Sequence, residues 1–201
     1  MEKTTKSLWA DTPFSLIPTP GRSEPVSNLS PPTYIAREMA CAHNGMLRAL
    51  NSIYNQCIHV QAPQDITDLL LYAKFWCEWL HEHHEAEEQF LFPEIERITE
   101  VKGLMQANIA QHDAFTPGLK AFHLYTKETS PQLYDGQKLR GIIDSFGPTL
   151  TQHLAEEVET LKGLEKYNGT VLKEAFLKFD AELRKGDKVS QRKSAILCPF
   201  L

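Results

Sequence analysis

Apolar residues recur every three or four positions through most of the chain, which is the spacing of one buried face of an α-helix. The pattern predicts four long helices and a short fifth one: residues 33–57, from Asp65 into HEHHEAEEQFLFPEIE, from Gly103 to Phe122, from Tyr134 to Leu161, and from Val171 to Leu183. Pro93 is expected to kink or end the second of these. Few stretches alternate as a β-strand would. Long amphipathic helices with short connections predict an all-α fold, an up-down four-helix bundle.

The segments on either side of the bundle have a different character. Prolines punctuate residues 1–32, where no helical or strand period appears, so we expect an extended N-terminal arm. Apolar residues such as Trp9 and Phe14 indicate that this arm lies along the domain, and a disordered leader is the alternative. Residues 33–167 would form the bundle, and residues 168–201 a short helix and a C-terminal tail.

Composition and charge argue against several classes of function. The chain has 21 Lys and Arg against 26 Asp and Glu, a formal net charge of −5, and no basic tract, which is unlike a nucleic-acid-binding protein. No apolar run is long enough to span a bilayer, so no transmembrane segment is expected. The four cysteines form no CxxC pair, which favours a reducing compartment and a cytoplasmic protein. Phosphate-binding loops, dinucleotide fingerprints and Ser-His-Asp sets are absent from the sequence.

Histidine is the residue type that points to function. His83 and Glu87 stand four residues apart on the second predicted helix, and His153 and Glu157 repeat that spacing on the fourth. Residues so spaced share one face of a helix. An imidazole and a carboxylate can therefore converge on one metal ion, or the carboxylate can be shared between two ions.

The first and third helices each contribute one more histidine, His43 in AHNGML and His112 in AQHDAF. Taken alone, such a histidine is more often a hydrogen-bonded core residue, and an HxxxE pair is more often an exposed ion pair. Four histidines and two carboxylates buried together without a metal, however, would carry a large desolvation cost. The sequence therefore predicts an interior metal site. Imidazoles and carboxylates without thiolates suit iron, manganese or zinc, and shared carboxylates favour a pair of iron ions.

The helix motifs resemble those of the hemerythrin family in its HHE cation-binding branch: AHN, HHEAEEQFLFP, QHDAF and HLAEE on successive helices. The segments LWADTPFSLIPTP, YDGQKL and IIDSFGPTLTQHL further resemble hemerythrin-like proteins of filamentous fungi. The resemblance covers nearly the whole chain. It implies a four-helix bundle around a non-haem di-iron centre with oxo or hydroxo and carboxylate bridges.

The resemblance also implies a role for each candidate ligand. It gives four histidine ligands, one on each helix, and two bridging glutamates: His43, His83, His112 and His153, with Glu87 and Glu157. These residues would hold two iron ions, with dioxygen as a further ligand or co-substrate.

The second helix leaves a choice of register. His84 and Glu88 have the same spacing as His83 and Glu87, rotated by about 100° around the helix, and the apolar pattern does not separate the two pairs. The family pattern HxxxEExxLFP favours His83 and Glu87. His84 and Glu88 then stand as possible additional ligands. The nearby HxxxE pair that begins at His81 is expected to be an outer or solvated pair.

One departure from the oxygen-carrying hemerythrins affects the expected activity. Those proteins place two histidines one turn apart on the third helix, whereas Asn108 stands one turn before His112 here. On the fourth helix the second carboxylate follows its histidine by four residues instead of five. The site would then have fewer nitrogen donors and more positions, near Asn108, open to water, dioxygen or substrate.

Open positions favour oxygen activation over reversible oxygen carriage. We therefore expect an oxygenase or oxidase that acts on a small organic molecule. A non-catalytic protein that binds or senses oxygen, nitric oxide or iron is the alternative, and a metal-free structural bundle is a third possibility.

Two further features have two interpretations each. Pro117 and Pro148 each lie five residues from a candidate ligand, and they either widen the bundle into a substrate pocket or only bend their helices. The C-terminal CPFL has the form of a prenylation signal at Cys198, although a proline after the cysteine is unusual there. An ordinary docked tail is the other interpretation.

Overall fold

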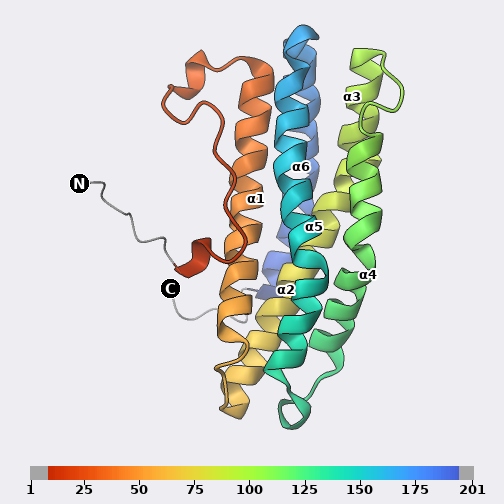
Figure 1. Cartoon of the computed structure of the whole chain (residues 1–201). Coiled ribbons are helices and arrows are strands. Elements are labelled where there is room, and N and C mark those ends of the chain that lie inside the picture. The colour runs from red at the N-terminus through yellow and green to blue at the C-terminus, as the bar shows by residue number, and fades with distance from the viewer. Residues whose placement is uncertain (1–8, 195–201) are drawn as a thin grey trace, which may run out of the picture.

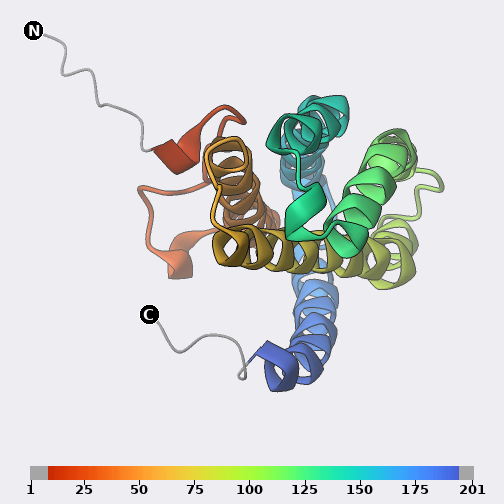
Figure 2. The same cartoon turned by 90° about the horizontal axis from the view of Figure 1, so that it is seen from below.

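The computed structural model describes the backbone of residues 9–194 and the side chains of residues 9–184. Within that range the chain is all-α and contains no strand. Four antiparallel helices form a ring (Figures 1 and 2), in which α1 neighbours α2 and α5, and α4 closes the ring between them. They are α1 (Pro31–Gln56), α2 (Pro63–Ala86), α4 (Gln106–Glu128) and α5 (Gly136–Lys162). The predicted four-helix bundle is confirmed.

The second bundle helix does not end at Pro93. α2 passes through a π-helical turn, Glu87–Leu91, into α3 (Phe92–Thr99). Pro93 lies in the first turn of α3, directly after the π turn. The π turn widens the helix just before the proline ring, and its closing bond runs from the Phe92 N–H to the Glu87 carbonyl. The break comes later, at Glu100, which has a left-handed φ of 57°.

The fifth helix is longer than the predicted residues 171–183. α6 spans Gly169–Ser194 and lies outside the ring, against α1 and the α2–α3 helix (Figure 2). It turns Phe176 and Phe179 into the protein, where both are buried. The apolar stripe of α6 ends at Leu183, and the polar residues after it carry no period that would reveal a helix. For that reason the sequence predicts too short an element.

The N-terminal arm lies along α1, and asparagine side chains of that helix bond its backbone. Asn51 is fully buried; its Oδ1 accepts from the Phe14 N–H at 2.9 Å, and its Nδ2 donates to two arm carbonyls. Two turns earlier, Asn44 bonds both the N–H and the carbonyl of Ile17. The Phe14 ring packs so closely on Gly147 of α5 that a Cβ at that position would overlap it. From residue 9 onward, the arm is therefore an added layer of the domain.

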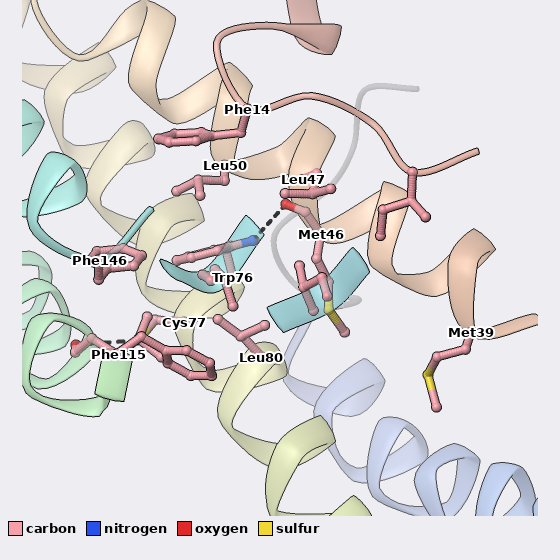
Figure 3. Packing of buried hydrophobic residues seen from close by; sticks show 14 of the residues in the cluster. Phe14, Met39, Met46, Leu47, Leu50, Trp76, Cys77, Leu80, Phe115 and Phe146 are labelled. Atoms are coloured by element: carbon pink, nitrogen blue, oxygen red, sulfur yellow. Dashed lines mark hydrogen bonds between the residues drawn. The ribbon is translucent and has the colours of Figure 1, made fainter. Parts of the chain in front are cut away.

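One part of the apolar core fills the half of the ring nearer the N-terminal part of α2. Trp76 donates its indole N–H to the Met46 carbonyl at 3.0 Å, and its ring stacks on that of Phe146 (Figure 3). The Trp76 ring also packs edge-on against that of Phe122. Phe115 lies at the border of this core, with its ring 5.2 Å from that of His84. Beyond Phe115 the interior of the ring becomes polar, and buried apolar residues such as Ile95 and Leu161 follow on the far side of this polar level.

Three expectations outside the bundle core can be compared with the structure. Pro117 and Pro148 lie inside α4 and α5, and both helices continue through them. No helix among the described residues is both long and apolar enough to cross a membrane. Cys198 lies outside the described residues.

Candidate metal centre

Two groups of candidate ligand atoms meet inside the ring, and within each group the atoms lie within 4.8 Å of one another. We call them the two-histidine group and the three-histidine group. The two-histidine group is His43, His83 and Glu87. The three-histidine group is His84, His112, His153 and Glu87. Every residue of both groups is buried, and Glu87 belongs to both.

Glu87 lies between the two groups because its two oxygens face opposite ways. Oε1 lies 2.7 Å from Nε2 of His83, in the two-histidine group. Oε2 lies 3.7 Å from Nε2 of His112, in the three-histidine group. The residue is fully buried at the start of the π turn. π turns inside α-helices recur at functional sites, and this one begins at the glutamate that the two groups share.

Glu157 of α5 makes a second connection between the groups. Its Oε2 lies 3.6 Å from Nε2 of His43 and 3.7 Å from Nε2 of His153. Glu157 is also fully buried. Two carboxylates that each reach histidines of both groups form the arrangement that a pair of bridged metal ions needs.

Three of the histidines form a hydrogen bond at Nδ1, on the side of the ring away from the centre, so their Nε2 atoms face the centre. The partners are the Leu154 carbonyl for His43 at 2.9 Å, Oε1 of Glu88 for His112 at 2.6 Å, and Oε1 of Gln111 for His153 at 3.1 Å. A partner behind a ligating imidazole fixes the tautomer and the ring orientation. The rings are therefore already set for ligation through Nε2.

Burial sets the charge state of the site. It lowers the pKa of His43 to about 3 and that of His83 to about 4, so both imidazoles are neutral at pH 7 and can act as ligands. Burial also lowers the pKa of His84 well below its usual value. In the opposite direction, burial raises the pKa of Glu87 and of Glu157 well above the usual range, and the charge of Glu87 adds to the effect on Glu157.

Five polar atoms at the centre lack hydrogen-bond partners within the protein, whereas Nε2 of His43 lies 3.3 Å from Nε2 of His83 and Nε2 of His112 lies 3.0 Å from Nε2 of His153. Both carboxylate oxygens of Glu87 and of Glu157, and Nε2 of His84, are buried without a hydrogen bond. Oε1 of Glu87 remains without a hydrogen bond despite its approach to within 2.7 Å of Nε2 of His83. Each such atom costs about 1–3 kcal/mol when left unpaired. Metal ions would satisfy all of these atoms at once, so the residues present fit a metal centre.

Comparison with known proteins agrees with this chemistry. Residues 35–164 match the family profile of the hemerythrin HHE cation-binding domain. The chain belongs to this family. It is also 36% identical over 176 residues to "Dimeric xanthone biosynthesis cluster protein R11" of Cryptosporiopsis sp. (strain 8999), an alignment that covers 87% of this chain and 67% of that protein. No solved structure matches the chain. A hemerythrin HHE domain implies metal binding, typically of iron, and the histidine–glutamate cluster supports it.

In this hemerythrin HHE domain both candidate registers of the second helix bring a histidine to the centre. His83 faces the two-histidine group and His84 the three-histidine group, while Glu87 reaches both. Glu88 lies behind His112, on the side of the ring away from the centre, and its side chain is 41% exposed. Adjacent histidines about 100° apart on one helix can each face a different ion. The sequence carries that signal in its HH pair.

The other sequence-predicted residues lie at the edges of the hemerythrin site. His81 and Glu85 face solvent with 4.0 Å between Nε2 and Oε2, which makes them a solvated pair. Asn108 is buried on α4, one turn before His112. The structure therefore brings five histidines to the centre, and His84 lies with His112 and His153 in the three-histidine group.

Proposed function

We propose that this protein holds two non-haem iron ions between the two histidine groups and uses them to activate dioxygen for the oxidation of a small organic molecule. The observation that carries the proposal is the placement of Glu87 and Glu157, each of which reaches histidines of both groups. Carboxylates shared between ions tolerate a change of oxidation state, and imidazole–carboxylate sites suit iron.

The two groups are unequal, and this supports an open side. The three-histidine group offers one more imidazole than the two-histidine group. The ion at the two-histidine group would therefore keep more positions for an exogenous ligand, as metals in catalytic sites do. We accordingly propose that the open positions lie beside His43 and His83, whereas the sequence suggests positions near Asn108.

The residues at and behind the centre have separate tasks in this proposal. Iron, when bound, supplies the redox chemistry through which dioxygen can react with an organic molecule. Neutral imidazoles hold the ions, because burial keeps the pKa of His43 and His83 far below 7. Glu87 and Glu157 balance the positive charge of the ions. Glu88 and Gln111 orient the rings of the three-histidine group from behind.

The similar protein from Cryptosporiopsis supports a metabolic role. Its name assigns it to a biosynthesis cluster for a dimeric xanthone. Assembly of such a product offers small organic molecules as candidate substrates, and we propose a substrate of this general kind for the present chain.

A specific observation also favours the second candidate, a non-catalytic protein that binds or senses oxygen, nitric oxide or iron. His84 brings the number of central imidazoles to five, so the nitrogen missing at Asn108 is replaced from another helix. A site with more protein donors leaves fewer positions for substrate. Both candidate functions require iron, so conversion of a substrate is the property that distinguishes them.

The test combines metal analysis, an optical spectrum and oxygen uptake on protein purified without air. About two irons per chain are expected, together with oxygen consumption that depends on an added aromatic metabolite. Two irons with an oxygen adduct that persists, and no uptake with any compound of a broad panel, would favour the binding protein. Absence of iron from protein grown with iron would refute both. His83→Ala and Glu157→Ala should abolish iron binding, whereas the exposed-pair variant His81→Ala should not.

A further inference from the structure

A pocket between α1, α2 and α6 has one of the candidate ligands in its wall. Its volume is about 340 Å³, within the range of about 300–1,000 Å³ that is usual for small-molecule sites. His83 of the two-histidine group lines this pocket. The other wall of the pocket is α6, which carries Phe179 with its ring 6.1 Å from that of His83. The helix outside the four-helix ring thus encloses a space against the metal centre.

Aromatic rings and methionine thioethers form part of the lining of this pocket. Phe176, Phe179 and Trp79 contribute three aromatic rings. Met39 and Met46 lie one turn on either side of His43 on α1, and both point toward the side on which α6 runs (Figure 3). Aromatic faces and thioethers are the groups that pack best on another aromatic ring.

Acidic side chains also line the pocket. Among the side chains that the structure describes, the lining contains the carboxylates of Glu38, Glu82 and Asp180 and one guanidinium, that of Arg184. Arg184 is already paired with Asp180, with 2.8 Å between Nε and Oδ2. A carboxylate accepts hydrogen bonds from hydroxyl groups, and an excess of negative charge repels anions. Glu38 in the pocket lining therefore favours neutral molecules that donate hydrogen bonds over anions.

We propose that this pocket, which we call the α6 pocket, binds a neutral hydroxylated aromatic molecule with its ring between the phenylalanines and methionines and its hydroxyl groups at the carboxylates. The proposal rests on the proposed function in one respect only, because it makes this molecule the one that is oxidised beside the two-histidine group. Binding itself requires only the lining residues.

The test uses the full chain loaded with iron and the probe 2,7-dihydroxynaphthalene, measured by titration calorimetry. We expect a Kd below about 1 mM, and binding of naphthalene-2-sulfonate that is at least about tenfold weaker. Cys41 gives an independent measurement, because it is exposed and lies in the pocket wall while Cys57 and Cys77 are buried. The bound diol should slow alkylation of Cys41, followed by peptide mapping.

Two variants and a matched control test the location. Cys41→Phe fills the pocket from an exposed position of α1 and should weaken the diol by at least about tenfold. Gln56→Phe places the same ring at an exposed position of α1 away from the pocket and should leave the Kd within about twofold. Glu38→Gln should narrow the difference between the diol and the sulfonate, which keeps the test valid if the phenylalanine variant fails to fold.

Each outcome decides a separate point. No diol binding at about 1 mM to folded protein that contains iron would overturn the α6 pocket and leave the iron proposal intact. Equal binding of the sulfonate, or an unchanged Kd in Cys41→Phe, would also overturn it. Diol binding that follows the expected pattern without oxygen uptake would support the α6 pocket and count against the oxidation reaction.

Discussion

Glu88, which contacts His112, either orients that imidazole from behind or is itself a metal ligand. Oε1 of Glu88 lies 2.6 Å from Nδ1 of His112, the ring nitrogen on the far side from the centre. A carboxylate behind a ligating imidazole orients the ring and raises its basicity, and losing it costs about 10–100-fold in metal affinity. The side chain of Glu88 is 41% exposed, so water screens part of the interaction. We therefore expect the lower value, about tenfold or about 1.4 kcal/mol, for Glu88→Ala.

The assay is competition for iron(II) between the protein and a chelator without air, with stoichiometry and affinity measured together. Glu88→Ala should still bind two ions, with the loss confined to affinity, and Glu88→Gln should recover part of it because the amide oxygen still accepts from Nδ1. Glu85→Ala, on the exposed face of the same helix, is the matched control and should behave as the unaltered protein. A drop from two ions to one would make Glu88 a ligand. Unchanged affinity would refute its orienting role.

Three other predictions use different parts of the molecule. His84→Ala should reduce the iron content by about one ion per chain, because His84 belongs to the three-histidine group. His81 belongs to neither group, so His81→Ala should leave the iron content unchanged. Metal analysis that finds two ions in both variants would exclude His84 as a ligand. Asn51→Leu should lower the free energy of unfolding by about 2–4 kcal/mol, since it leaves three buried or half-buried arm backbone groups without partners. The half-buried Asn55 bonds two more exposed arm carbonyls, so Asn55→Leu should cost about 1 kcal/mol. Equal shifts of the urea midpoint in the two variants would contradict this prediction. Metal-free protein should lose stability as the pH falls from about 6.5 toward about 4. In that window the unfolded histidines gain protons that the buried ones, with their lowered pKa values, do not. The two buried glutamates have raised pKa values and act in the opposite direction, but the five histidines outnumber them. A urea midpoint that stays constant or rises as the pH falls would refute the prediction that the five histidines outweigh the two glutamates.

The fold was readable from the sequence wherever helices bury one continuous stripe. The period of 3.6 residues identified all four bundle helices, and capping residues such as Ser30 and Asp135 lie at the starts of two of them. The period cannot report a helix whose last turns carry no apolar stripe in the sequence, which is why α6 exceeds the predicted length. Nor can it report the π turn at Glu87, because that turn adds one residue to the count without changing the apolar character of the segment.

The candidate ligands were predictable one helix at a time, and their grouping was not. Spacing of four residues places His83 and Glu87 on one face, and it makes His84 and Glu88 look like a competing choice. Two ions, however, need donors on two faces of the same helix. The role of each residue then depends on what the neighbouring helices present: α1 opposite His83, and α4 and α5 opposite His84. That information is tertiary, so a single sequence could only leave both registers open.

The same reasoning changes where the site is open. A missing histidine on the third helix suggests an open position there, but a donor lost from one helix can be replaced from another when both face the same ion. In the proposed centre His84 would make up for the donor missing at Asn108, and no additional histidine joins His43 and His83 among the described residues. The side with fewer imidazoles is also the side that α6 covers with Phe176 and Phe179. A helix added outside a complete bundle contributes little to the central core, and here it supplies a wall for the α6 pocket at the place where the metal centre has the fewest protein donors.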